Sequence, residues 1–258
     1  MSGQPVREGV ATVFEPRAGV PCVVCRPPSP RGVMVHFHGG GYRLGSARAW
    51  LPFGARLASA TGVEVIVPDY RLAPEHPFPA ALHDAAAILE SVADASSLLI
   101  SGDSAGGGLA MASALLAAGR ERPPIGVVLL SPWLDLTVSA ETYLSRAATD
   151  PLFSLASARE AAETYLQGEP AEHPLASPLL ADLGRAPPTL IMASGAEVLL
   201  QDSLGLASRL ALAGRDVSLH VAPDERHVWP VLTPDRPASE QALRMIGQFV
   251  GRLLAGRA

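Results

Sequence analysis

Gly102-Asp103-Ser104-Ala105-Gly106 is the stretch that decides the fold, because an apolar run (residues 97–101) precedes it and a helical pattern (residues 105–118) follows it. A strand, a tight turn of small residues and a helix form the setting in which a G-x-S-x-G sequence becomes a nucleophile elbow. A serine hydroxyl is a weak nucleophile at neutral pH, and a sharp turn lets a separate base reach its proton. Ser104 is therefore the first candidate for covalent chemistry.

The composition limits the class of protein. The chain has 258 residues, 48% of them hydrophobic, so it can bury a large core, and α/β chains of this length are commonly single domains. Its net charge is −5 and it has no basic block, which argues against a nucleic-acid partner. Cys22 and Cys25 are the two cysteines, too few for a disulfide framework or a four-ligand zinc site.

Neither a secretory signal nor a membrane anchor is expected. Residues 1–30 carry several charges and lack a seven-residue apolar core, which a signal peptide needs. No apolar run reaches the length of a membrane span. We therefore predict a cytoplasmic protein that does not insert into membranes.

Apolar, β-branched runs alternate with helical patterns, which is typical of a mostly parallel sheet covered on both faces. The predicted strands cover residues 9–15, 20–26, 32–37, 63–68, 97–102, 125–131, 189–194 and 217–222. The first two have no helix between them, so we expect an antiparallel hairpin at one edge. The predicted helices cover residues 50–60, 80–93, 105–118, 202–213 and 238–254. The sequence therefore predicts one doubly wound α/β domain over residues 1–258.

Residues 133–188 interrupt this alternation. One helical pattern, residues 154–166, lies among loops rich in proline and alanine. A loop-dominated insertion of this length inside a domain is usually functional or disordered. Because it follows the sixth strand, we expect a small lid over the open end of the sheet, where ligands bind in α/β folds. The alternative is a surface loop with no role in the site.

A second glycine-rich stretch, His38-Gly39-Gly40-Gly41-Tyr42, directly follows the strand that ends at Phe37. Attack on a carbonyl leaves a negative charge on its oxygen, which backbone amides in such a turn can stabilise. Three glycines alone would fit any tight turn, but this position ahead of the elbow is that of an oxyanion loop. The donors that we assign are the amides of Gly40, Gly41 and Ala105, with Gly39 as the alternative to one of them.

The base and the acid follow from chain order. Seven histidines compete for the role of base, and His227 lies directly after the last strand, at the end of the sheet where Ser104 must lie. The order in this arrangement is nucleophile, acid, histidine, so the acid belongs just after the strand at residues 189–194. Glu197 is the first candidate, and Asp202, on the first turn of the next helix, is the second. The carboxylate would orient the imidazole and stabilise its protonated form.

Two further aspartates are expected to be structural. Asp103 adjoins the nucleophile, but neighbouring residues of a tight turn point in different directions, so we expect it to hydrogen-bond nearby loops. Asp135, after Pro132-Trp133, is expected to do the same.

Four motifs resemble, in this order, those of the bacterial hormone-sensitive-lipase-like carboxylesterases of the α/β-hydrolase superfamily: His38-Gly39-Gly40-Gly41, Asp69-Tyr70-Arg71-Leu72-Ala73-Pro74-Glu75, Gly102-Asp103-Ser104-Ala105-Gly106-Gly107 and His227-Val228-Trp229. The resemblance runs from about residue 31 to the C-terminus. It implies an α/β-hydrolase fold, hydrolysis of esters with small or medium acyl chains, no cofactor, and often a dimer. By position it implies Ser104 as nucleophile, His227 as base and Glu197 as acid, where many members carry aspartate. It also implies that Arg71 and nearby carboxylates brace the loops around the elbow.

The sequence thus predicts a serine carboxylesterase with an eight-stranded, mostly parallel sheet and a small lid after the sixth strand. A lactone hydrolase would use the same three residues, and an amidase or peptidase is a more distant alternative. A non-catalytic small-molecule receptor is the candidate from another class. The last strand, residues 217–222, is an apolar edge that could pair two copies into a homodimer. Candidate walls of the pocket are Tyr42, Leu44, Leu152, Phe153 and Leu166.

Overall fold

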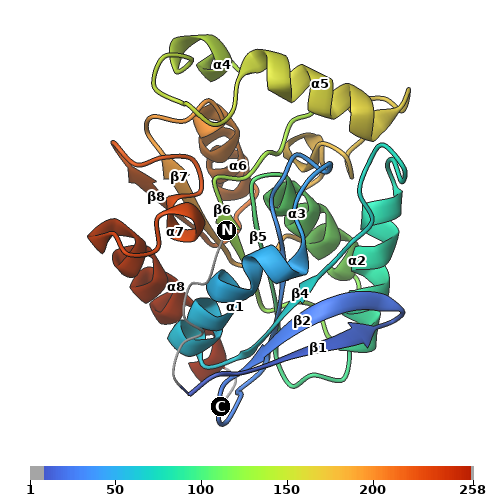
Figure 1. Cartoon of the computed structure of the whole chain (residues 1–258), viewed down its shortest axis with the longest axis vertical. Helices are drawn as coiled ribbons and strands as arrows, with labels where there is room; N and C mark the ends of the chain where they lie inside the picture. The colour runs from blue at the N-terminus through green and yellow to red at the C-terminus, as the bar shows by residue number, and fades with distance from the viewer. Residues whose placement is uncertain (1–8, 257–258) are drawn as a thin grey trace.

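One eight-stranded sheet organises the computed structural model, which describes residues 9–256 (Figure 1). The strand order is β1-β2-β4-β3-β5-β6-β7-β8. The strands are β1 (Ala11–Arg17), β2 (Val20–Arg26), β3 (Val33–Phe37), β4 (Glu64–Pro68), β5 (Leu98–Asp103), β6 (Gly126–Leu130), β7 (Thr189–Ser194) and β8 (Val217–Ala222). All eight predicted strands are therefore confirmed. Residues 1–8, part of the segment in which no secretory signal is expected, lie outside the described residues.

The predicted hairpin at the edge of the sheet is confirmed. β1 pairs with β2 and β2 with β4 in antiparallel fashion, whereas the remaining neighbours are parallel. The turn between β1 and β2 is Ala18-Gly19, with φ of 49° and 82°. Positive φ at both central residues is the type I′ geometry that matches the twist of a hairpin. β8 forms the opposite edge of the sheet.

Helices cover both faces of the sheet (Figure 1). They are α1 (Ala47–Thr61), α2 (Ala80–Ser91), α3 (Ala105–Ala117), α4 (Thr142–Ser145), α5 (Leu155–Leu166), the 3₁₀ turn η1 (Pro178–Leu180), α6 (Leu200–Leu212), α7 (Trp229–Leu232) and α8 (Pro237–Ala255). Side chains of α1 and α8 form one buried cluster with the sheet, and those of α2, α3 and α6 form the other. Strands β4, β5, β6 and β7 are buried along their whole length. This double coverage explains why they are continuous apolar runs.

The helix boundaries differ most at α1, which begins at Ala47 rather than at residue 50. Ser46 is its N-cap, and the Ser46 hydroxyl accepts a hydrogen bond from the Ala49 amide at 3.2 Å. A serine at this position satisfies one of the amides that a helix start leaves without a partner. The short elements α4, η1 and α7 were not predicted, because each is too short for a helical periodicity to show.

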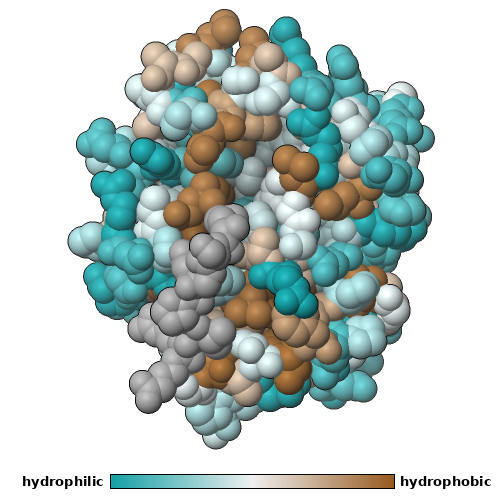
Figure 2. Space-filling view, viewed as in Figure 1, coloured by the Kyte–Doolittle hydropathy of each residue, from teal (hydrophilic) through white to brown (hydrophobic). Residues whose placement is uncertain are grey.

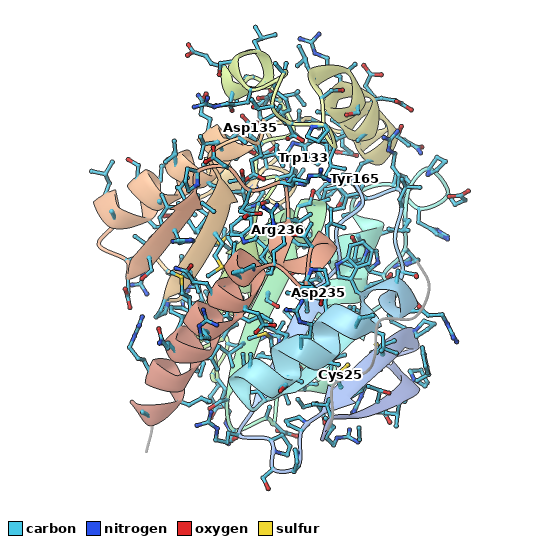
Figure 3. The ribbon with its side chains drawn as sticks, turned by 60° about the vertical axis from the view of Figure 1, so that its left-hand side comes forward. Cys25, Trp133, Asp135, Tyr165, Asp235 and Arg236 are labelled. Atoms are coloured by element: carbon cyan, nitrogen blue, oxygen red, sulfur yellow. The ribbon has the colours of Figure 1, made fainter. Side chains whose placement is uncertain are left out.

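The segment 133–188 contains α4, α5 and η1, and α4 and α5 lie above the sheet at the top of Figure 1. Figure 3 shows Trp133 and Tyr165 between these helices and the strands. Both side chains are fully buried, with 0% and 2% of their surface exposed. We call residues 133–188 the lid segment. Within residues 9–256, no helix combines the length and the apolar character that a membrane crossing requires.

Candidate active site

Ser104 lies at a strained turn between β5 and α3. Its backbone has φ 53° and ψ −123°, a region that residues other than glycine rarely adopt. Strain of this kind persists only where the surroundings enforce it. A Cβ atom on Gly102 would lie 2.1 Å from the Gly106 carbonyl oxygen, and one on Gly106 would lie 2.1 Å from that of Phe37. The two glycines of the motif are therefore needed for close backbone approach, and the turn presents the serine at the carboxyl end of β5.

Three predicted residues meet at this turn, although they are distant in the chain. The Ser104 hydroxyl lies 3.0 Å from His227 Nε2, and His227 Nδ1 lies 2.8 Å from Glu197 Oε2. His227 Nδ1–H donates to the carboxylate, which leaves Nε2 free to accept the serine proton. All three side chains are largely buried, with 9%, 7% and 1% of their surface exposed for Ser104, His227 and Glu197.

The second carboxylate oxygen of Glu197 is also held. Oε1 accepts a hydrogen bond from the Ser194 amide at 3.0 Å. The Ser194 side chain in turn donates to the Glu225 carbonyl, two residues before His227. A glutamate side chain is one methylene longer than that of aspartate and has one more rotatable bond. The hydrogen bonds at both carboxylate oxygens hold it in one conformation. The loop carrying the acid and the loop carrying the histidine are thereby joined at their bases.

The environment of His227 sets its basicity. Burial lowers the pKa of His227, but the hydrogen bond to Glu197 and the negative charges of Glu197, Asp150 and Asp103 raise it more, so the net pKa is above the ordinary value of 6.5. A carboxylate bonded to the ring favours the protonated form. The imidazole is therefore a stronger base than a free histidine, as the removal of a serine proton requires.

The glycine loop after β3 lies beside the serine. Gly40 and Gly41 have φ of 126° and 62°, and a Cβ on Gly40 would lie 2.0 Å from the Leu44 carbonyl oxygen. The amides of Gly40, Gly41 and Ala105 donate no hydrogen bond to any residue between 9 and 256. Ala105 is the first residue of α3, where the helix itself offers its amide no acceptor. These three N–H groups are therefore available to an external oxygen.

Gly39, the alternative donor, packs directly against the elbow. A Cβ atom there would lie 2.4 Å from Asp103 Oδ2 and 3.1 Å from the Ser104 Cβ. The loop thus contacts the elbow directly through a residue without a side chain. Tyr70 supports the same loop, because its hydroxyl donates to the His38 carbonyl at 2.6 Å and its ring stacks on the His38 ring.

Arg71 braces the loops as expected, but its partner lies on a helix rather than in its own motif. The guanidinium of Arg71 pairs with Asp84 of α2 at 2.7 Å. Asp69 of the motif instead accepts a hydrogen bond from the Ala47 amide at the start of α1. The motif therefore ties the segment after β4 to both α1 and α2.

Asp103 has a structural role, as predicted, but its partners lie on β3 and α1 rather than in loops. Its Oδ1 accepts hydrogen bonds from Trp50 Nε1 at 2.8 Å and from His36 Nε2 at 3.2 Å, and His36 Nδ1 pairs with the Ser101 hydroxyl at 2.8 Å. This buried chain of polar groups joins β3, β5 and α1 next to Ser104.

Asp135 and Asp202 both hold the beginning of the lid segment. Asp135 accepts from the Thr137 amide at 2.9 Å and from the Ser139 hydroxyl at 3.2 Å, as expected. Asp202 lies in the first turn of α6, but its carboxylate accepts from the amides of Leu134 and Asp135 at 2.8 and 3.1 Å. Burial raises the pKa of Asp202 to about 7, partly offset by these two bonds. The alternative acid therefore contacts the lid segment and makes no hydrogen bond to His227.

Aromatic rings pack near His227 and the start of the lid segment. The Phe153 ring lies nearly parallel to the His227 ring, with centroids 6.2 Å apart, and contacts Trp133 at 5.4 Å. Tyr42 stacks on Tyr165 of α5 at 3.8 Å. Trp133 and Tyr165 were not singled out from the sequence, although large aromatic residues in a predicted lid would have been a usable signal. Of the other candidate walls, Leu166 is buried, whereas Leu44 and Leu152 are 69% and 49% exposed.

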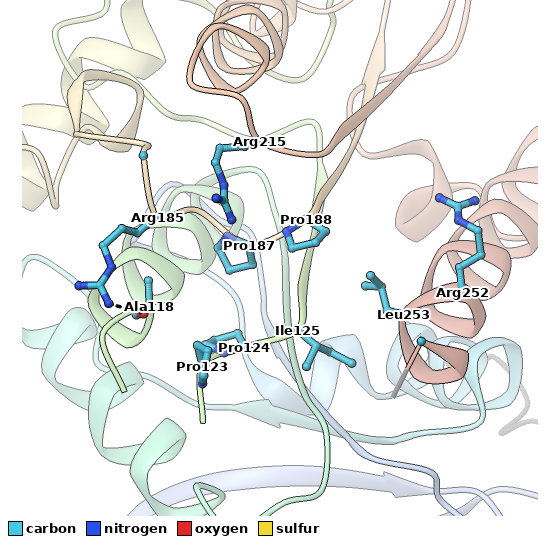
Figure 4. Close-up of a pocket in the computed structure, with 12 residues that line it drawn as sticks. Ala118, Pro123, Pro124, Ile125, Arg185, Pro187, Pro188, Arg215, Arg252 and Leu253 are labelled. Atoms are coloured by element: carbon cyan, nitrogen blue, oxygen red, sulfur yellow. Dashed lines mark hydrogen bonds between the residues drawn. The ribbon is translucent and has the colours of Figure 1, made fainter. Parts of the chain in front are cut away.

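A separate cavity of about 570 Å³ lies at the opposite ends of the strands, where β6 and β7 begin (Figure 4). Three arginines border it, and each has a structural explanation. Arg185 donates to the Ala118 carbonyl at the end of α3, Arg215 donates to the Ala186 carbonyl, and Arg252 lies in the last turn of α8. Cations at the C-terminal ends of helices stabilise the helix dipole. We find no nucleophile or base among its lining residues, which are Ala118, Pro123, Pro124, Ile125, Gly184, Arg185, Pro187, Pro188, Arg215, Arg252, Leu253 and Gly256.

Comparison with known proteins gives the family. Residues 34–231 match the family described as alpha/beta hydrolase fold. An acetyl-hydrolase from Streptomyces hygroscopicus is 38% identical over 223 residues, covering 84% of this chain and 74% of the relative. An esterase from Acinetobacter venetianus is 34% identical, covering 86% of this chain and 75% of the relative.

A solved structure of an esterase from the bacterial hormone-sensitive lipase family superposes with a TM-score of 0.92 at 36% identity. The superposition covers 97% of this chain and 87% of the other. Sequence motifs, sheet order and site geometry agree with these likenesses. The chain therefore belongs to the α/β-hydrolase fold family and, within it, to the branch related to bacterial hormone-sensitive lipase.

Proposed function

We propose that this chain hydrolyses carboxylic esters with short to medium acyl chains through an acyl-enzyme on Ser104. The observation that carries the proposal is the hydrogen-bonded chain from Ser104 through His227 to Glu197, built on a strained turn. Relatives named acetyl-hydrolase and esterase support an ester as the substrate and do not favour a lactone. A surface with apolar residues below the lid segment, between mostly hydrophilic flanks, suits the acyl part of such a substrate (Figure 2).

The mechanism follows from the positions of the atoms. The Ser104 hydroxyl attacks the ester carbonyl while His227 Nε2 takes its proton, and Glu197 stabilises the imidazolium that forms. The negative charge moves to the carbonyl oxygen, which the amides of Gly40, Gly41 and Ala105 bind. His227 then returns the proton to the departing alcohol, leaving an acyl group on Ser104. His227 then takes a proton from a water molecule, which attacks the acyl carbonyl. The bond to the Ser104 oxygen breaks, His227 returns the proton to that oxygen, and the carboxylic acid leaves.

Each of these steps uses side chains and amides of the chain itself, and no step requires a metal. Among residues 9–256 there is no cluster of three or more histidine, cysteine or acidic side chains that could hold a metal ion. Cys22 and Cys25 are free and buried. Burial raises the pKa of Cys22 to about 11, so its reactive thiolate form is scarce at neutral pH.

Replacement of Ser104 by alanine tests the proposal. Ser104→Ala should abolish steady-state hydrolysis of p-nitrophenyl butyrate, leaving at most a residual ~10³ over water from the oxyanion loop. Ser113→Ala is a matched control, because Ser113 is a buried serine of α3 whose hydroxyl has no partner among residues 9–256. A fluorophosphonate should label Ser104 in the wild type and in Ser113→Ala. Full activity of Ser104→Ala would refute the assignment, and absence of labelling would favour the receptor.

Three further proposals complete this function. The lid segment, residues 133–188 within a single domain, covers the site and shapes the acyl pocket, which is supported by the contact of Phe153 with His227.

The edge strand β8 pairs with its copy in a homodimer, since β8 has one neighbour in the sheet. Gel filtration before and after Leu219→Lys, an exposed position of β8, tests the dimer. A cytoplasmic location stays a prediction from the sequence.

A further inference from the structure

We propose that Asp150 of the lid segment is a positioning residue for this reaction, because its carboxylate clamps the loop that carries Glu197 and holds Phe153 over His227. The inference rests on the proposed function and adds to it a residue outside the catalytic three. Asp150 is 48 positions from Val198, and its side chain is 7% exposed.

Both oxygens of Asp150 are used, and they reach in different directions. Oδ2 accepts a hydrogen bond from the Val198 amide at 2.9 Å, directly after Glu197 in the chain. Oδ1 accepts from the amides of Leu152 and Phe153 at 3.0 and 3.1 Å. One buried carboxylate thus connects the backbone next to Glu197 with the backbone of Phe153, whose ring stacks on that of His227.

Two threonines of the lid segment reinforce the clamp. The Thr149 hydroxyl donates to the Ala196 carbonyl at 2.7 Å, and the Thr142 hydroxyl donates to the Val198 carbonyl at 2.6 Å. The residues before and after Glu197 are therefore both bonded to the lid segment. Hydrogen bonds to an ionised acceptor are about twice as strong as neutral ones. Asp150 supplies the charged member of this set.

The negative charge of Asp150 also influences the protonation of His227. Three carboxylates act on His227: Glu197 from the loop after β7, Asp103 from the end of β5 and Asp150 from the lid segment. Each favours the protonated ring, which carries the positive charge when serine attacks. Loss of a negative charge near His227 shifts this titration, whereas loss of a hydrogen bond that only stabilises the fold does not, so the pH dependence of activity separates the two roles.

Asp150→Asn is the decisive variant. Asparagine keeps the size, but its NH₂ group must face either the Val198 amide or those of Leu152 and Phe153, and one arm of the clamp is lost. We expect kcat for p-nitrophenyl butyrate to fall by about 10- to 100-fold with little change in KM, because misplacing a catalytic group by ~1 Å can cost ~10²-fold. The acid limb of the pH profile, which is the fall of kcat/KM at low pH, should move to lower pH. The reason is that a negative charge near His227 is lost.

Asp135→Asn is the matched control. Asp135 is also a lid aspartate, 8% exposed, but among residues 9–256 its side chain bonds only Thr137 and Ser139. It should keep the wild-type acid limb. A wild-type kcat and acid limb in Asp150→Asn would overturn the inference, and so would the same loss of both activity and melting temperature in the two variants.

Thr149→Val decides the matter if Asp150→Asn does not fold. It removes the neutral bond to Ala196, so kcat should fall while the acid limb stays in place, and wild-type kcat would overturn the clamp. Ser104→Ala is run in parallel. An active Ser104→Ala would mean that the proposed function has failed, whereas an inactive Ser104→Ala beside a fully active Asp150→Asn would mean that only the clamp has failed.

Discussion

Replacing Glu197 by glutamine removes one charge and almost no volume. The carboxylate now receives hydrogen bonds at both oxygens, from His227 Nδ1 at 2.8 Å and from the Ser194 amide at 3.0 Å. Glutamine has one accepting oxygen. If this oxygen faces His227, the NH₂ group faces the Ser194 N–H, and two donors meet at a side chain that is 1% exposed. If it faces Ser194, the NH₂ group favours the tautomer with a proton on Nε2, which cannot take the serine proton.

The magnitude follows from the charge that develops on His227. In the transition state an imidazolium lies next to the carboxylate, and two unit charges about 4 Å apart interact by about 4 kcal/mol at an effective dielectric constant of 20. Each 1.36 kcal/mol is a factor of ten in rate, so kcat should fall by about 10³-fold. The pKa of His227 should also fall, because its strongest raising partner is lost.

The assay is steady-state hydrolysis of p-nitrophenyl butyrate from pH 5 to pH 9, a range around the ordinary histidine pKa of about 6.5. Asp202→Asn is the control, since Asp202 is the other buried acid after β7. We expect Glu197→Gln to lose most of its kcat and to shift its acid limb to lower pH, and Asp202→Asn to keep both. If Asp202→Asn lost as much kcat as Glu197→Gln, or if Glu197→Gln stayed fully active, the reasoning would be wrong.

Three other predictions concern pH and the oxyanion loop. In the wild type, kcat/KM should be lost as pH falls through a midpoint above 6.5, because the raised pKa of His227 leaves it protonated there; a pH profile checks this. Asp202 has a folded-state pKa of about 7 against an ordinary 3.8, so it destabilises the fold as pH rises between these values. Urea unfolding should therefore show Asp202→Asn gaining about 2 kcal/mol on the wild type between pH 5 and pH 8. Gly40→Ala keeps the amide, but its Cβ would clash with the Leu44 carbonyl oxygen and displace the N–H from the oxyanion position. We therefore expect kcat to fall by about 10²-fold or more, the cost of losing one oxyanion donor, and differential scanning fluorimetry will separate this effect from unfolding.

Much of the fold was predictable because the signals are local. Strands β4 to β7 are apolar along their whole length, and small residues mark the turn at Ser104. Chain order then led to Glu197 and His227, because parallel strands bring their carboxyl ends to one edge of the sheet. The start of α1 was misplaced because the Ser46 cap precedes the apolar pattern rather than forming part of it.

The contacts of the lid segment could not be predicted in this way. Asp150 follows no periodic pattern, and its bond to Val198 joins residues that no motif relates. The aromatic contact between Phe153 and His227 likewise depends on how a proline-rich segment packs, which neither propensity nor spacing determines. Asp202 shows the same limit, because its place in a first helical turn gave no sign that its carboxylate is buried against the lid segment.

The two ends of the catalytic chain are consequently held by different kinds of force. At Ser104, steric contacts between backbone atoms of Gly102, Gly106 and Phe37 leave one workable conformation, so substitutions there are excluded by volume. At Glu197, the neighbouring backbone is held by two hydrogen bonds: the Asp150 carboxylate accepts one from the Val198 amide, and the Thr149 hydroxyl donates one to the Ala196 carbonyl. Changes in the lid segment should therefore retune the acid and the base while the elbow stays intact. Ser104 could be identified from the sequence because a steric requirement restricts the residue types around it. The contacts of the lid segment could not, because a hydrogen bond to backbone restricts residue type only weakly.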